Sequence, residues 1–159
     1  MGAVLAAGLV LAAAGTAWAQ PPIVSTEVTR FPDESFSDEP TQCQDELYTT
    51  TFSKSMAVEH FTYFPETGVL HFHLSSHAKV VAVPLDGTGP TYTGNTREVV
   101  SDTWNVERGE LVHRTFLNRF VARGSDGSRA FIYEHVHFIF NANGVKTVDF
   151  DTERLVCSG

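Results

Sequence analysis

From Ile23 onward, apolar and polar residues alternate in short runs that are rich in β-branched and aromatic side chains. Clusters of Gly, Pro, Asn, Asp and Ser separate these runs at regular spacing, a pattern typical of consecutive antiparallel strands. No helical periodicity of useful length appears. The predicted strands are 23–29, 47–53, 57–64, 69–75, 79–84, 97–105, 110–123, 129–140 and 145–155.

Short turns between these runs force neighbouring strands to pair antiparallel, so the sequence predicts an all-β meander. About eight strands in one domain favour closure into a β-barrel, because closure removes exposed sheet edges. A β-sandwich is the alternative.

Three hairpins allow the register to be predicted, since a one-residue slip moves every side chain to the other face. The turn after Phe64 sets Phe61 opposite Phe72, and the turn at 124–128 sets Phe116 opposite Val136. In the last hairpin, Gly144 in the left-handed position pairs Asn141 with Val145. The shared apolar face, taken as the core, then comprises Phe61, Tyr63, Leu70, Phe72, Leu74, Phe116, Phe120, Ile132, Val136, Phe138, Phe140, Val148 and Phe150.

Residues 1–19 carry no charged side chain and end in Ala17-Trp18-Ala19, a pattern that signal peptidase can cut. The sequence therefore predicts a signal peptide (1–19), an acidic N-terminal segment with the first strand (20–46) and a β-barrel domain (47–159). An uncleaved membrane anchor is the alternative reading of the first segment. With cleavage, the protein is exported and no span remains.

Net charge is −8, and much of it lies between Glu27 and Glu46, where seven acids accompany one base, Arg30. An acidic chain of this kind is a poor candidate for binding nucleic acid or anionic membranes. A solvated lead-in explains the run of acids, which lack the spacing of a calcium loop.

Two cysteines, Cys43 and Cys157, are predicted to form one disulfide, as expected for an isolated pair in an exported protein. The bond would close almost the whole domain. A redox function would require a local Cys-x-x-Cys, which the sequence lacks.

Histidines gather on the face opposite the apolar one, because alternate residues of a strand share a face. In the predicted register His60 lies opposite His73, with His71 diagonal to it. These three imidazoles are the candidate ligands of a zinc or copper ion. His137 and His135 are predicted to face Asp149 and Asp151. Solvated or cross-strand paired side chains are the alternative for both groups.

Glu134 is predicted on the apolar face, beside Asn118 and Thr152. A carboxylate inside a barrel would mark a ligand pocket and could act as an acid or a base; a hydrated Glu134 at the barrel mouth is the alternative. Arg119 and Tyr133, on the histidine side, complete the predicted ligand-binding set.

Catalytic motifs are lacking: the sequence has no Gly-x-Ser-x-Gly elbow, no phosphate-binding Gly-rich loop, no His-Glu-x-x-His and no free nucleophilic cysteine. The residues favour a protein that is not an enzyme.

Residues 122–127, His135 to Phe138, the turn 141–144 and the terminal cysteine resemble small exported proteins of actinomycetes that have no assigned function. The resemblance covers about the C-terminal third, and it implies a secreted β-barrel-like domain without a known activity.

Together these observations predict a secreted binding module for a small apolar ligand or a protein partner. A His-ligated metal-binding protein or metalloenzyme is the second hypothesis, and a structural protein with a filled interior is the third.

Overall fold

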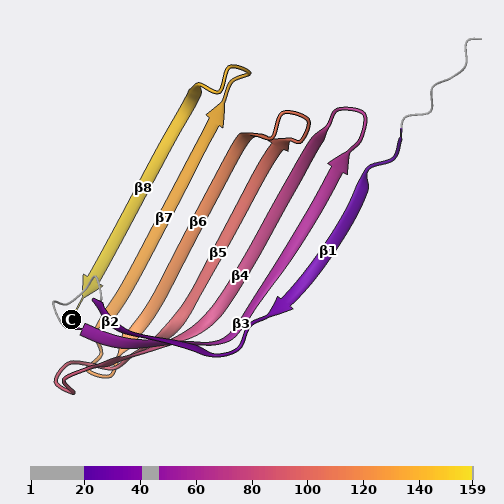
Figure 1. Cartoon of the computed structure of the whole chain (residues 1–159). Coiled ribbons are helices and arrows are strands. Elements are labelled where there is room, and N and C mark those ends of the chain that lie inside the picture. Colours follow the sequence, from indigo (N-terminus) through magenta and orange to yellow (C-terminus); the bar gives the residue numbers. More distant parts are fainter. Residues whose placement is uncertain (1–19, 41–46, 159) are drawn as a thin grey trace, which may run out of the picture.

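The computed structural model describes residues 20–40 and 47–158, and these form a single antiparallel sheet (Figure 1). The predicted signal peptide and Cys43 lie outside the described residues. Within the described ranges no helix is long and apolar enough to cross a membrane. The strands are β1 (Ile23–Arg30), β2 (Glu34–Pro40), β3 (Leu47–Phe64), β4 (Val69–Pro84), β5 (Tyr92–Asn105), β6 (Glu110–Gly124), β7 (Arg129–Phe140) and β8 (Lys146–Ser158).

Strand order is β1-β3-β4-β5-β6-β7-β8, and β2 also pairs with β3. β1 lies along residues 56–63 of β3, whereas β2 lies along residues 47–52, so the two short strands share one edge. The all-β class and the meander from β3 to β8 are confirmed.

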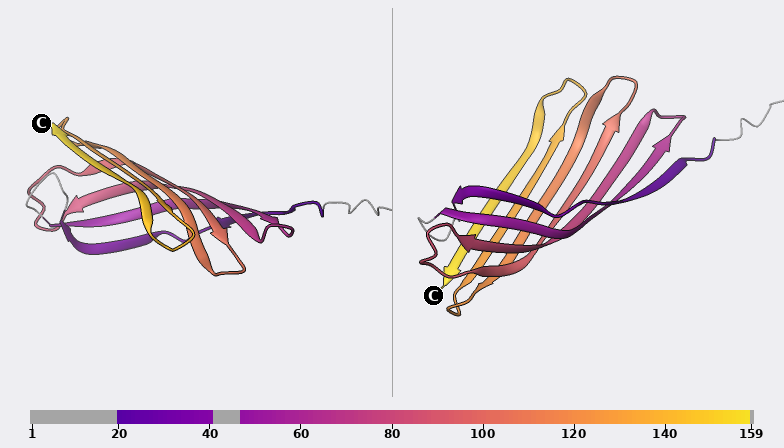
Figure 2. Two further views of the ribbon diagram at one scale, coloured as in Figure 1. Left: turned by 90° about the horizontal axis from the view of Figure 1, so that it is seen from above. Right: turned by 60° about the horizontal axis from the view of Figure 1, so that its bottom comes forward.

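The predicted closure into a barrel is not supported, because the sheet remains open between β8 and the strands that flank β3. Figure 2 shows a strongly coiled sheet whose first and last strands do not meet side by side. The edge of β3 that β8 would need for closure is already paired with β1 and β2.

Two pairs of predicted strands are each one long strand. The predicted strands 47–53 and 57–64 both belong to β3, which bends at a bulge where Lys54 has a φ of 52°. The predicted strands 69–75 and 79–84 are both part of β4. β2, which lies in the acidic segment, was not predicted.

Each strand places alternate side chains on opposite faces of the sheet. We call the face that carries Phe61 and Phe72 the inner face, and the face that carries His60 and His73 the outer face. The buried Asp102 lies on the inner face. So does every buried hydrophobic residue of the described chain: Tyr48, Ala57, Ala78, Val80, Ala82, Tyr92, Ala122 and Ala130. The inner face is therefore the concave side of the coiled sheet.

The tightest part of the coil is the end of the sheet where β3 begins. The rings of Tyr48 and Tyr92 approach to 5.9 Å although β4 separates their strands, and on β4 the small side chains of Ala82 and Pro84 lie opposite Tyr92 and Tyr48, respectively. Gly94 lies on the same face, where a Cβ would clash with the Val121 carbonyl oxygen. Small residues thus permit the bend that forms the small core.

Two predicted registers are confirmed. Phe61 pairs with Phe72 and His60 with His73 across β3 and β4, and Phe116 pairs with Val136 across β6 and β7.

The predicted register of the last hairpin is wrong by one residue. The turn closes as predicted, with a hydrogen bond from the Asn141 amide to the Val145 carbonyl and a φ of 71° at Gly144. Thr147 is then left over in a bulge, where its hydroxyl bonds the Ile139 carbonyl at 3.2 Å. Val148 and Phe150, predicted in the core, therefore lie on the outer face and are 39% and 46% exposed.

We expect Gly94→Ala to lower the free energy of unfolding by about 2 kcal/mol, because its Cβ meets backbone atoms of β6 that cannot yield without straining the coil. Denaturant titration measures the change. Asn95→Ala, at an exposed position of the outer face, is the control and should change stability by less than about 0.5 kcal/mol. Equal effects of the two substitutions would contradict this account of the bend.

Candidate functional site

The inner face carries an apolar area toward the hairpin turns between β3 and β4, β5 and β6, and β7 and β8. We call it the inner apolar patch; it comprises Phe61, Leu70, Phe72, Leu74, Trp104, Phe116, Val136 and Phe138. The Phe61 and Phe72 rings pack at 4.9 Å. All eight side chains are half-buried, since no second layer of the described chain covers them.

Carboxylates cross the inner face directly below this patch. Glu98, Asn118, Glu134 and Glu153 face one another in order along β5, β6, β7 and β8. Glu27, Glu59 and Asp151 lie one level nearer the patch. We call the six carboxylates the acidic belt: Glu27, Glu59, Glu98, Glu134, Asp151 and Glu153.

The acidic belt has no counter-charge of its own. Among residues 20–40 and 47–158, none of its members forms an ion pair. Glu27 lies directly opposite Glu59, and Glu134 directly opposite Glu153, arrangements that destabilise an antiparallel pair. The belt is thus a region of negative charge beside an apolar surface.

An ion pair between the buried Asp102 and the partly exposed Arg114 lies within the inner apolar patch. Arg114 Nε donates to Asp102 Oδ1 at 2.8 Å, and Arg114 Nη2 donates to Asp102 Oδ2 at 2.6 Å. The hydrogen bond to Asp102 raises the pKa of Arg114 despite partial burial. Sequence analysis missed this pair, whose signal was an acid and a base at equivalent apolar-face positions of neighbouring strands.

The structure divides the predicted ligand-binding residues between the two faces. Glu134 lies opposite Asn118 on the inner face, as predicted, but Glu153 rather than Thr152 flanks it on β8. Arg119 and Tyr133 lie opposite each other on the outer face. Only Glu134 and Asn118 therefore share a surface with the inner apolar patch.

All seven histidines lie on the outer face, including His77, which was not among the predicted candidates. Nδ1 of His60, His71 and His73 bonds a hydroxyl of a neighbouring strand: Thr26 at 2.7 Å, Thr103 at 3.1 Å and Ser101 at 2.8 Å, respectively. Among the described residues, no three His, Cys, Asp or Glu side chains gather into a potential metal site. Metal binding by His60, His71 and His73 stays a prediction.

The predicted histidine–aspartate pairs do not form, because the Thr147 bulge turns Asp149 and Asp151 to the inner face. His137 lies opposite Phe150, and His135 lies opposite Thr152. His137 instead shares the Thr115 hydroxyl with His113, at 2.9 Å and 3.3 Å, and their rings lie 4.9 Å apart.

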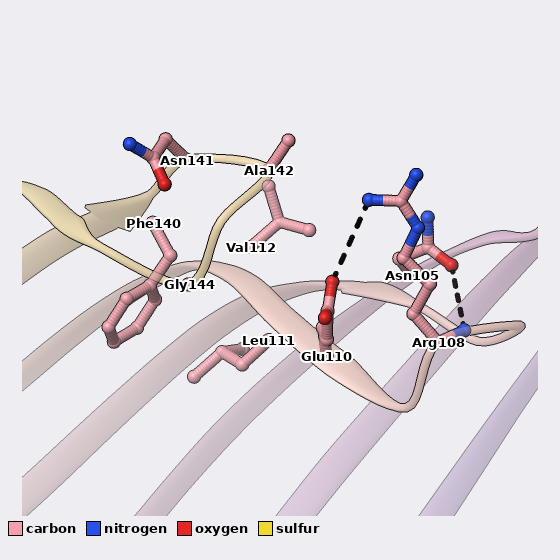
Figure 3. A pocket seen from close by; sticks show the side chains of 9 residues that line it. All are labelled: Asn105, Arg108, Glu110, Leu111, Val112, Phe140, Asn141, Ala142 and Gly144. Carbon is pink, nitrogen blue, oxygen red and sulfur yellow. Dashed lines mark hydrogen bonds and ion pairs between the residues drawn. The ribbon is translucent and has the colours of Figure 1, made fainter.

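A pocket of about 480 Å³ adjoins the inner apolar patch at the turn end of the sheet (Figure 3). Leu111, Val112, Phe140 and Ala142 supply its apolar lining, whereas Arg108 and Glu110 pair at 3.9 Å on the opposite side. Its residues come from the turn regions of two hairpins, β5–β6 and β7–β8. Sequence analysis did not single them out, because turn residues carry no periodic signal.

Comparisons with protein families, with curated proteins and with solved structures found no match to this chain. The geometry of the two faces is therefore the basis of the proposed function.

We expect Arg114→Met to lower the free energy of unfolding by about 3 kcal/mol, because it leaves the Asp102 carboxylate buried without a partner. The double variant Asp102→Leu/Arg114→Met should lose less, since it buries no unpaired charge. Denaturant unfolding of both variants tests this, and a double variant as unstable as the single one would contradict it.

We also expect the free energy of unfolding to decrease as the pH falls, because of His113. Burial first, and then the neighbouring His137, lower the pKa of His113 in the folded protein. Protonation therefore favours the unfolded chain, and stability is lost as pH falls from about 6.5 through the lowered pKa. The melting temperature of His113→Gln should depend less on pH in this range than that of the wild type; identical profiles would exclude the effect.

Proposed function

We propose that this protein is a secreted, non-enzymatic binding module whose inner face holds an apolar ligand that carries a positive charge. The observation that carries the proposal is the juxtaposition, on one concave face, of an uncovered aromatic surface and the acidic belt. Glu134 and Asn118 would then be polar contacts of the ligand.

The inner apolar patch supports an apolar ligand body. Aromatic and branched side chains that remain half-exposed gain free energy when a ligand removes them from water, by roughly 25 cal/mol for each Å² of apolar surface. The adjoining pocket extends this surface past Leu111 and Phe140. Pockets for small molecules are typically apolar and carry a few polar groups that orient the ligand.

The charges on the inner face support a ligand with a cationic end. The two basic residues on the inner face are already paired, Arg114 with Asp102 and Lys146 with Asp149 at 3.1 Å. The six carboxylates of the acidic belt therefore offer negative potential that no described residue neutralises. An ammonium or guanidinium group beside Glu98 and Glu134 would relieve their repulsion, whereas an anionic group would add to it.

The predicted disulfide fits the same function. Cys157 lies in β8, at one edge of the open sheet, and in the sequence Cys43 follows β2, a strand at the other edge. A bond between them would join the two edges and hold the concave face at a fixed width. Such a bond is in keeping with export, which remains part of the proposal.

Trp104 provides the reporter for a test, because it belongs to the inner apolar patch and is the single tryptophan of the chain from Gln20 onward. We expect dodecyltrimethylammonium, below its micellar concentration, to shift Trp104 fluorescence saturably. Dodecanoate, with the opposite charge, should bind at least about tenfold more weakly at low salt, and the difference should shrink as salt screens the belt. Far-UV circular dichroism verifies that the sheet stays folded.

Glu98→Gln/Glu134→Gln should weaken the binding of dodecyltrimethylammonium about fivefold and leave the binding of neutral dodecanol unchanged. Glu66→Gln/Glu107→Gln removes the same charge from the turns and is the matched control. The proposal fails if neither amphiphile gives a saturable change, or if the anion binds as well as the cation.

A further inference from the structure

The outer face collects most of the positive charge of this acidic protein. Of its 11 lysines and arginines, seven lie on the outer face of β1 and β4–β8. We call them the basic band; they are Arg30, Lys79, Arg97, Arg119, Arg123, Arg129 and Arg154. All seven are exposed, so their charges are presented to solvent.

The basic band forms levels that run across the strands. Arg30, Arg97, Arg119 and Arg154 occupy one level, where His77 also lies. Lys79 lies on the next level, and Arg123 and Arg129 lie on the level beyond it. Strands are about 4.8 Å apart, and same-face residues along a strand are about 7 Å apart. The cations from Arg97 to Arg154 therefore form a positive track with steps of about 5 to 10 Å, and Arg30 stands about 14 Å from Arg97.

No described carboxylate neutralises this track. Within β1 and β3–β8, every Asp and Glu except Glu110 lies on the inner face, and Glu110 stands at the turn end beside Arg108. Among residues 20–40 and 47–158, none of the seven cations forms an ion pair. The outer face is therefore basic although the chain as a whole is acidic.

Two pairs of arginines face each other directly across strands, Arg97 with Arg119 and Arg123 with Arg129. Like charges in directly opposed positions destabilise an antiparallel pair, whereas an arginine opposite a carboxylate would stabilise it. The fold thus accepts a repulsion that an anion from outside would remove.

Arg123 and Arg129 also line a hollow of about 420 Å³, whose floor includes Gly94, Ala122 and Ala130. The side chains of Ala122 and Ala130 point to the inner face, so the backbone of these residues and of Gly94 forms that floor. An anionic group could enter this recess and be contacted from β6 and β7 together.

We propose that the basic band binds a linear phosphate polymer laid across the strands. Six of the seven cations are arginines, whose planar guanidinium groups bind phosphate oxygens in pairs. A flexible chain can follow a convex face from β1 to β8, whereas a flat lipid surface would contact only part of it. The surface is separate from the inner face, so this proposal does not depend on the proposed function.

Net charge alone argued against such a partner, because a charge of −8 repels polyanions at long range. The structure changes that inference by separating the charges onto two faces. At short range, within the Debye length of about 8 Å at physiological salt, a bound polymer interacts mainly with the basic band.

The test is fluorescence anisotropy with end-labelled inorganic polyphosphate over a series of salt concentrations, using the full exported chain. We expect saturable binding whose logarithm falls linearly with the logarithm of salt concentration. Arg97→Gln/Arg119→Gln should weaken binding about tenfold and reduce the salt slope by about 1.4, the change expected for two lost phosphate contacts. Its melting temperature should not fall, since the substitutions relieve a repulsion.

Arg108→Gln/Lys146→Gln is the matched control, because it removes the same charge from cations outside the basic band. It should bind polyphosphate within about twofold of the wild type at any salt concentration, in line with the local origin of the attraction. Equal losses in the two double variants would overturn the proposal, and so would the absence of saturable binding at low salt.

The same wild-type protein and double variants would also detect two other occupants of the basic band. Tighter binding to vesicles that contain phosphatidylglycerol than to polyphosphate would overturn the proposal and identify a membrane surface as the partner. Assembly of the protein alone at low salt, abolished by Arg97→Gln/Arg119→Gln, would show that the acidic inner face of a second copy occupies the band. Light scattering measures that assembly.

Discussion

The antiparallel hydrogen-bond ladder that runs from β3 to β8, together with its bulges, determines where every functional side chain lies. Once the ladder fixes the register, alternation sends each residue to one face or the other. Acids, apolar residues and the Asp102–Arg114 pair gather on the inner face, while histidines and most arginines gather on the outer face. The two proposed binding surfaces are consequences of this one constraint.

The open sheet leaves uncovered an apolar surface that a closed barrel would bury. In a barrel, the inner apolar patch would be covered by strands from the opposite wall. Here β1 and β2 occupy the edge of β3, so the second edge of β8 has no partner strand among the described residues, and the concave face stays accessible. An apolar surface left half-exposed beside charge is characteristic of an interaction site rather than of a completed core.

Sequence reasoning succeeded where local signals agreed with each other. The turns after Phe64 and Gly124 and the apolar pattern around them point to the same pairing, so the His60–His73 and Phe116–Val136 pairs could be predicted. It failed where the decisive feature leaves no local signal. The Thr147 bulge follows a turn that is itself as predicted, and the pairing of β1 and β2 with β3 joins residues distant in sequence.

The distribution of charge between the two faces was the feature least predictable from the sequence. Summed along the chain, the charges suggest an acidic surface throughout, because composition ignores the face on which each residue stands. Arg97 and Glu98 are adjacent in sequence yet lie on opposite faces, and the same holds for Glu153 and Arg154. Only the complete register separates them.

The bulge at Thr147 shows how finely this separation is balanced in evolutionary terms. If Thr147 instead entered the ladder opposite Ile139, each later residue of β8 would move by one position and the two sides of the strand would be exchanged. Asp149 and Asp151 would then stand beside His137 and His135, and Phe150 would join the apolar side. Loss of the Thr147 codon alone would leave this arrangement unchanged, because the bulged residue has no partner in the ladder. A residue that pairs with nothing therefore decides which chemistry each side of β8 displays.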